Sequence, residues 1–214
     1  MSRRNLAPVL LAAAVAVIGL AAWAWSSSRV NTWPIKNDPP AVDGPVVAFG
    51  DSYTYGYGAP EGEGYVDVLA RLVGRPIVAD GVPGATSGDS LARLDDAAAL
   101  KPRIALVFLG GNDILRQRGK DEMRENVRAI VRRFHEGGAL VVVVGIDGFP
   151  ALGREFDKEL RRMAREEAAV FVPGALVGIL DNPALRADPL HPDDKGYELL
   201  ARRIDEHAGP WLRK

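Results

Sequence analysis

The chain has 214 residues, of which 47% are hydrophobic and 26% are charged, a composition typical of one globular domain with additional segments. Its formal net charge of -1 argues against a nucleic-acid-binding protein, because phosphate recognition usually requires an excess of basic residues. Cysteine is absent, which excludes a thiol nucleophile and thiolate metal sites and leaves the redox compartment undecided.

The first 25 residues read as an export signal or a membrane anchor. Arg3 and Arg4 precede residues 6–25, a run without charge that is long enough to cross a hydrocarbon core of about 30 Å as a helix. A cleaved signal peptide fits the small-x-small pattern Ala22-Trp23-Ala24, whereas the length of the run favours an uncleaved anchor. In either case the N-terminus faces the cytoplasm and the rest of the chain is exported.

Residues 26–45 contain four prolines and little apolar periodicity. Proline at this density predicts an extended linker between the N-terminal segment and a domain at 46–214. An alternative is that the last ten residues of the linker lie along the surface of the domain.

From residue 46 onward, strand-like and helix-like segments alternate. Short apolar runs predict strands at 46–49, 77–79, 104–109, 140–146 and 170–172, and the first of them reads as a strand buried on both faces. Apolar residues at helical spacing predict helices at 65–73, 87–100, 121–135, 154–168 and 193–207. This alternation implies right-handed crossovers and a mostly parallel, doubly wound α/β sheet without a second domain.

The first predicted strand runs directly into Gly50-Asp51-Ser52. A serine at the end of a buried parallel strand lies at the carboxyl edge of the sheet, where open α/β folds bind their ligands. Serine is a poor nucleophile by itself, so this position needs a base, an orienting acid and oxyanion donors from elsewhere in the chain.

The chain offers three histidines as the base. His135 and His207 fall in predicted amphipathic helices, and we interpret both as helix-surface or face-edge residues. His191 and Asp188 each precede a proline, which predicts a stiff, non-helical loop. Asp188 could reach Nδ1 of His191 there and leave Nε2 free as a base; alternatively, this loop is a plain helix entry capped by Asp193.

Two loops that follow neighbouring strands could supply oxyanion donors. Gly84 lies after the second predicted strand, so its amide could be free and close to a substrate. Asn112 follows two glycines after the third strand and could offer its side-chain N–H. The alternatives are that Gly84 serves only a turn and that Asn112 or Asp113 caps the next turn.

Together these segments resemble the four blocks of the SGNH (or GDSL) hydrolases, in the family's order: Gly50-Asp51-Ser52, Gly84, Gly111-Asn112-Asp113 and Asp188-x-x-His191. The resemblance runs from residue 46 to the C-terminus. It is greatest to bacterial periplasmic multifunctional esterases that act as acyl-thioesterase, arylesterase and lysophospholipase. It implies a flavodoxin-like three-layer α/β/α sandwich with a five-stranded parallel sheet. It also implies a periplasmic domain, either free or anchored to the inner membrane.

The resemblance also implies a role for each matching residue. Ser52 is expected to be the nucleophile, with its own N–H as one oxyanion donor and with Gly84 and Asn112 as the other two. His191 is expected to act as general base and then general acid, oriented by Asp188. No metal ion or organic cofactor is implied.

Tyr53 departs from the family pattern, which often has a small aliphatic residue after the serine. We consider Tyr53, Tyr55 and Phe149 as candidate walls of the substrate pocket, although the tyrosines could equally be ordinary loop packing. Asp147, close to Phe149 in sequence, could make the pocket less apolar.

The expected function is therefore hydrolysis of carboxylic esters or thioesters through an acyl-serine intermediate, with a small-molecule or lipid ester as substrate. A membrane would be a further partner if the N-terminal segment stays uncleaved, and nucleic acid is not an expected partner. Two alternatives are an extracytoplasmic polysaccharide O-deacetylase, which would use the same residues, and an inactive exported binding module.

Overall fold

The structure is a computed structural model that describes residues 31–214. Trp33–Lys214 forms one compact unit, and the other unit, Met1–Thr32, lies almost entirely outside the described residues. The signal or anchor segment predicted at 1–25 also lies outside them. Within residues 31–214, no helix is long and apolar enough to cross a membrane.

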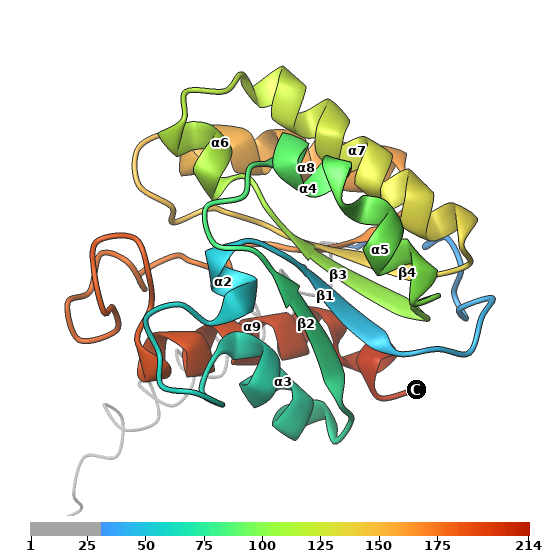
Figure 1. The fold of residues 1–214 in the computed structure, drawn as a ribbon, viewed down its shortest axis with the longest axis horizontal. Helices are drawn as coiled ribbons and strands as arrows, with labels where there is room; N and C mark the ends of the chain where they lie inside the picture. The colour runs from blue at the N-terminus through green and yellow to red at the C-terminus, as the bar shows by residue number, and fades with distance from the viewer. Residues whose placement is uncertain (1–30) are drawn as a thin grey trace, which may run out of the picture. The chain divides into compact units, whose positions relative to one another are not determined.

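The centre of the described unit is a sheet of five parallel strands in the order β2-β1-β3-β4-β5 (Figure 1). The strands are β1 (Val46–Gly50), β2 (Ile77–Gly81), β3 (Ile104–Phe108), β4 (Leu140–Val144) and β5 (Val170–Val172). Every residue of β1, β3, β4 and β5 is buried, which explains why these strands read as continuous apolar runs. The predicted parallel α/β sheet is confirmed.

Eight helices are found in the described part of the chain. They are α2 (Ser52–Tyr55), α3 (Tyr65–Val73), α4 (Ser87–Ala92), α5 (Leu94–Ala99), α6 (Gly111–Leu115), α7 (Lys120–Glu136), α8 (Gly153–Glu166) and α9 (Asp194–Leu212). Helices α3 and α9 pack together on one face of the sheet, whereas α4, α5, α7 and α8 cover the other face (Figure 1). The three layers confirm the predicted sandwich.

The helices differ from the predicted ones in two ways: one predicted helix is broken, and two short helices were not predicted. The single helix predicted at 87–100 is two helices, because Arg93 has φ -108° and ψ 7° and ends α4 while it begins α5. The one-turn helices α2 and α6 were not predicted, since a single turn is too short for apolar periodicity to show. Both follow directly after a strand, and both carry predicted site residues.

The segment before β1 is part of the folded unit rather than a free linker. The Trp33 indole N–H donates to the Ala169 carbonyl over 2.9 Å, and the Asn37 side chain donates to the His135 carbonyl over 2.9 Å. The domain therefore begins near Trp33 and not at residue 46. The Asn37 contact agrees with the alternative that residues 36–45 lie along the domain surface, and the Trp33 contact extends this attachment beyond the residues that the alternative named.

His135 lies in the core and not at a helix surface. It is 3% exposed at the end of α7, and like the predicted apolar residues Met123, Val127 and Phe134 of that helix it is buried. Within the described residues, neither ring nitrogen of His135 has a hydrogen-bond partner. Burial lowers the pKa of His135 to about 4, so the ring is neutral near pH 7.

Candidate active site

Ser52 lies at the carboxyl edge of the sheet, where β1 ends. Asp51 caps the one-turn helix α2 by accepting the Tyr53 N–H over 3.1 Å, and Ser52 is the first residue of that helix. The serine is 7% exposed, so its hydroxyl meets the exterior only through the cavity that it lines. A strand end followed at once by a helix therefore presents the Ser52 hydroxyl at the sheet edge.

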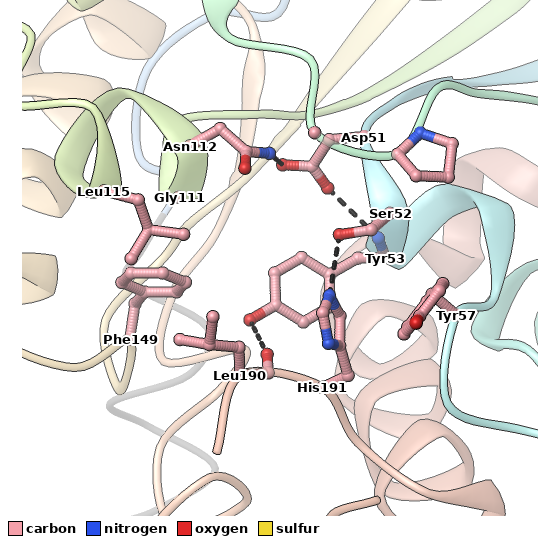
Figure 2. Close-up of a pocket in the computed structure, with 12 residues that line it drawn as sticks. Asp51, Ser52, Tyr53, Tyr57, Gly111, Asn112, Leu115, Phe149, Leu190 and His191 are labelled. Atoms are coloured by element: carbon pink, nitrogen blue, oxygen red, sulfur yellow. Dashed lines mark hydrogen bonds between the residues drawn. The ribbon is translucent and has the colours of Figure 1, made fainter. Parts of the chain in front are cut away.

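His191 reaches Ser52 from the loop that precedes α9. His191 Nε2 lies 3.0 Å from Ser52 Oγ (Figure 2). His191 Nδ1 lies 2.8 Å from Asp188 Oδ2. A carboxylate on Nδ1 fixes the proton there and leaves the lone pair of Nε2 toward the serine. The structure thus brings together the three residues for which the sequence predicted a catalytic role.

The Asp188 carboxylate also shapes the loop in which it lies. Asp188 Oδ1 accepts the backbone N–H of Leu190 over 2.7 Å and that of His191 over 2.9 Å. Burial acts to raise the pKa of Asp188, but the hydrogen bonds from His191 and Leu190 outweigh it and hold this pKa below its usual value. Asp188 therefore remains an anion that can accept the Nδ1 proton.

Two backbone amides beside Ser52 Oγ are free to donate. Gly84 has φ +80°, a conformation that favours glycine, and it lines the same cavity as Ser52. Within residues 31–214, the N–H groups of Ser52 and Gly84 donate to no protein acceptor. Both amides were predicted as oxyanion donors, and their free N–H groups suit that role.

Asn112 also borders the cavity, but its amide already has two acceptors. Asn112 Nδ2 donates to Asp51 Oδ2 and to the Ala85 carbonyl, each over 3.1 Å (Figure 2). The side chain thereby joins three loops that follow β1, β2 and β3. To donate to an oxyanion as predicted, Asn112 must exchange one of these two hydrogen bonds.

Two buried carboxylates lie directly behind these groups, and sequence reasoning gave neither a role in the site. Asp51 is 1% exposed, and its burial raises its pKa to about 7. Asp113 is also 1% exposed and accepts both the N–H and the hydroxyl of Ser87, over 2.9 and 2.6 Å. Burial raises the pKa of Asp113 as well. The signal in the sequence was that both aspartates fall in blocks shared with the SGNH hydrolases, Gly50-Asp51-Ser52 and Gly111-Asn112-Asp113, although no role was assigned to either.

A cavity of about 360 Å³ opens in front of Ser52 and His191. Its walls are largely apolar: Tyr53, Tyr57, Pro83, Leu115, Phe149 and Leu190 (Figure 2). Two of the three predicted walls, Tyr53 and Phe149, do line it. Asp147 does not line it, and the aliphatic walls Leu115 and Leu190 had not been identified from the sequence.

Tyr55 was predicted as the third wall, and the structure contradicts this prediction. Its side chain is 65% exposed and does not line the cavity, whereas Tyr57 does. Each residue of a helix turns about 100°, so Tyr55 points about 200° away from Tyr53 around α2. Treating residues 52–55 as a loop concealed this difference in direction.

Among residues 31–214, no group of three histidine, aspartate or glutamate side chains is arranged to hold a metal ion. The groups that the structure brings together at the cavity are a serine hydroxyl, an imidazole, a carboxylate and backbone amides. Such a set can transfer an acyl group to the serine and then to water.

Comparisons with known proteins agree with this site. The model of the GDSL-like Lipase/Acylhydrolase family matches residues 48–199, a span that contains Ser52, Asp188 and His191. Esterase TesA of Pseudomonas aeruginosa is 28% identical over 180 residues, which cover 78% of this chain and 87% of the relative.

Solved structures show the same fold. A crystal structure of TesA has a TM-score of 0.71 at 26% identity and covers 78% of this chain and 98% of that chain. AlinE4, an SGNH-hydrolase family esterase, is 31% identical with a TM-score of 0.60, and the alignment covers 79% of this chain and 97% of that chain.

Proposed function

Because the chain belongs to the GDSL-like Lipase/Acylhydrolase family and is a carboxylic ester hydrolase, we propose that it works through an acyl-serine intermediate on Ser52. The family predicted from the sequence is confirmed by the match over residues 48–199. The observation that carries the proposed mechanism is the unbroken path from Asp188 through His191 to Ser52, with contacts of 2.8 and 3.0 Å.

The reaction proceeds in two halves. His191 Nε2 accepts the hydroxyl proton of Ser52 while Oγ attacks the carbonyl carbon of the ester or thioester. The tetrahedral intermediate collapses, the bond to the leaving oxygen or sulfur breaks, and His191 returns the proton to the leaving group. Water then attacks the acyl-serine with His191 again as base, which releases the carboxylic acid and restores Ser52.

The negative oxygen of the tetrahedral intermediate needs donors, and the free amides of Ser52 and Gly84 supply two. Asn112 supplies the third when its N–H turns from Ala85 or Asp51 to the oxyanion. Such donors act where water is excluded and the charge develops, so each contributes to the rate rather than to substrate binding alone.

The walls of the cavity favour an acyl group over a sugar. Leu115, Phe149 and Leu190 provide apolar surface, which binds hydrocarbon and offers few partners for sugar hydroxyls. We therefore place the substrate among acyl esters and thioesters of the arylesterase, lysophospholipase and thioesterase type.

Export is part of the same proposal. The uncharged run at 6–25 behind Arg3 and Arg4 would carry the domain out of the cytoplasm, and if uncleaved it would hold the domain on the inner membrane. Cell fractionation and N-terminal sequencing of the mature protein test this point. A cytoplasmic protein that retains residue 1 would contradict it.

The nucleophile is tested by replacing Ser52 with alanine and measuring hydrolysis of a chromogenic butyrate ester by the full chain. We expect Ser52→Ala to lose hydrolysis. Ser90→Ala is the matched control, because the buried Ser90 hydroxyl has no hydrogen-bond partner in the described part of the chain. An active Ser52→Ala protein would refute the proposed mechanism.

The substrate class is tested with a panel of esters from acetyl to palmitoyl, together with a lysophospholipid and an O-acetylated glycan. We expect the highest kcat/KM with acyl chains longer than acetyl, since only these reach the apolar walls. Release of acetate from the glycan with no activity on longer acyl chains would favour the polysaccharide O-deacetylase instead.

A further inference from the structure

The tyrosines that follow Ser52 have no role in the mechanism above. Tyr53, Tyr55 and Tyr57 occur at alternate positions in the loop after β1, but only two of them face the site. Tyr53 and Tyr57 lie on either side of the His191 imidazole, with ring centroids 6.0 and 4.6 Å from it (Figure 2). Tyr55 points to solvent. Substitutions at Tyr53 and Tyr57 can therefore be compared with the same substitutions at Tyr55, which lies outside the site.

Tyr53 connects the nucleophile turn to the histidine loop. Its hydroxyl donates to the Leu190 carbonyl over 2.6 Å, and its ring stacks on Phe108 with centroids 5.1 Å apart. Tyr53 follows Ser52, and Leu190 precedes His191, so this hydrogen bond runs beside the contact between Ser52 Oγ and His191 Nε2. It therefore joins the two backbones that carry the reacting atoms.

The environment of Tyr53 keeps its hydroxyl in the donor state. The residue is 3% exposed, and burial together with the nearby Asp51 charge raises its pKa well above the usual value. A buried neutral hydroxyl needs a partner, and the Leu190 carbonyl is the partner it has. The hydroxyl proton of Tyr53 is thus committed to the Leu190 carbonyl and is not free to be donated to a substrate.

Tyr57 lies on the side of the His191 imidazole opposite Tyr53. Its backbone carbonyl accepts the Tyr197 hydroxyl from α9 over 2.8 Å. The next residue, Gly58, has φ +97°, and a Cβ there would lie 2.7 Å from the Pro192 carbonyl oxygen and 3.2 Å from His191 Cβ. The chain therefore passes close against the histidine loop at this point, and the Tyr57 ring packs beside the imidazole.

We propose that Tyr53 and Tyr57 are positioning residues that hold His191 within reach of Ser52, Tyr53 through its hydroxyl and Tyr57 through its ring. The inference rests on the proposed function of His191 as the base. The need for such support lies in the loop itself, because the Asp188 side chain is 40% exposed and the loop has solvent on one side. Displacement of a catalytic group by about 1 Å can lower a rate roughly 100-fold.

The competing interpretation is that both tyrosines act only as pocket walls, since both line the cavity. The two roles predict different kinetics. A wall changes KM and the preference for acyl-chain length, whereas a residue that positions His191 changes kcat by the same factor for every substrate.

The experiment measures kcat and KM of the full chain for acetyl, butyryl and octanoyl esters with substitutions at the three tyrosines. Tyr53→Phe keeps the ring and removes only the hydroxyl, and we expect kcat to fall about tenfold with KM nearly unchanged. Tyr57→Leu should lower kcat by a similar factor, about tenfold, and the conservative Tyr57→Phe should restore most of that loss. The hydroxyl matters at one position and the ring at the other.

Tyr55→Phe and Tyr55→Leu are the matched controls in the same segment, and both should leave the kinetics unchanged. The rate of inactivation by a small fluorophosphonate provides a second readout, because it depends on the Ser52–His191 contact and little on the acyl pocket. It should fall in parallel with kcat in Tyr53→Phe and Tyr57→Leu. Thermal unfolding should confirm that each variant is folded.

Three results would overturn the inference. The first is a change in KM or in chain-length preference with kcat unchanged, the second is a loss of kcat in Tyr55→Leu equal to that in Tyr57→Leu, and the third is full reactivity of both Tyr53→Phe and Tyr57→Leu toward the fluorophosphonate. None of these would affect the proposed nucleophile, which Ser52→Ala tests separately. If Ser52→Ala is inactive and the tyrosine variants are fully active, only the positioning role fails.

Discussion

The carboxylates of this protein are held in two different ways in two regions. At the carboxyl edge of the sheet, Asp51 and Asp113 are 1% exposed, and within the described residues neither forms an ion pair. On the outer surface of α7 and α8, arginines surround the glutamates. Arg124 contacts Glu159 over 2.8 Å, and Arg128 contacts Glu167 over 2.8 Å.

The pKa shifts follow from this difference. Burial raises the pKa of Asp51 to about 7 with no cation to oppose it. Burial also acts to raise the pKa of Glu167, but hydrogen bonds from Arg132 and Arg128 hold it below its usual value. On the helix surface the paired arginines keep the glutamates ionised, whereas the sheet edge retains carboxylates that cost stability and contact the catalytic loops.

The largest effect expected from the site is that of Asp188→Asn. An amide in place of the carboxylate cannot accept the Nδ1 proton of His191 in the same way, so the imidazole adopts the wrong tautomer, and kcat should fall roughly 1,000- to 10,000-fold. Steady-state kinetics on a short-chain ester measure this. Asp194→Asn, in the exposed first turn of α9, is the control and should leave kcat within about twofold. A normal kcat in Asp188→Asn would remove Asp188 from the mechanism.

The next effect is that of Asn112→Ala. It removes one proposed oxyanion donor and also a hydrogen bond to the buried Asp51, so kcat should fall about 100-fold and stability should decrease. Steady-state kinetics measure the fall in kcat, and urea unfolding measures the loss of stability. Asn182→Ala, at an exposed turn, serves as the control. Loss of stability with no loss of kcat would make Asn112 structural only.

Asp51→Asn tests whether the site costs stability. The pKa of Asp51 rises from 3.8 to about 7 on folding, so the stability that its protonated form contributes is complete below about pH 4 and is lost as pH rises to about 7. The amide has one acceptor oxygen and loses one of the two hydrogen bonds that the Asp51 carboxylate accepts, at every pH. Relative to the original protein, the unfolding free energy of the variant should therefore be higher at about pH 8 than at about pH 4, by on the order of 2 kcal/mol, while kcat falls. Urea unfolding at both pH values measures this, and a difference between the two proteins that does not depend on pH would contradict the account.

The smallest effect is expected on the helix surface. Arg128→Gln breaks contacts to Glu125, Glu166 and Glu167, yet surface ion pairs contribute little, so we expect a loss of about 1 kcal/mol or less that shrinks at high salt. Activity should not change. A loss of unfolding free energy as large as that of Asn112→Ala would contradict the difference drawn between the helix surface and the sheet edge.

The elements that the sequence predicted well are those with a simple periodic signal. Strands β1, β3, β4 and β5 are runs of buried residues, and the apolar face of α7 repeats at helical spacing. His191 was distinguished from His135 and His207 because two prolines mark its loop as non-helical. Local chemistry was enough in these cases.

The features that the sequence did not reveal depend on tertiary contacts or on single helical turns. The position of Trp33 on the domain depends on a carbonyl more than 100 residues away. Tyr55 was placed in the pocket because the turn of α2 could not be recognised. The two acceptors of Asn112, and the burial of His135, come from groups that meet only in the folded protein.

The central claim is that Ser52 forms the covalent acyl intermediate. Mass spectrometry of the full chain after reaction with a fluorophosphonate ester tests it most directly. The account predicts a single adduct that maps to Ser52, complete loss of hydrolysis in step with labelling, and no adduct in Ser52→Ala. An adduct on another residue, or hydrolysis that continues after Ser52 is fully labelled, would contradict it.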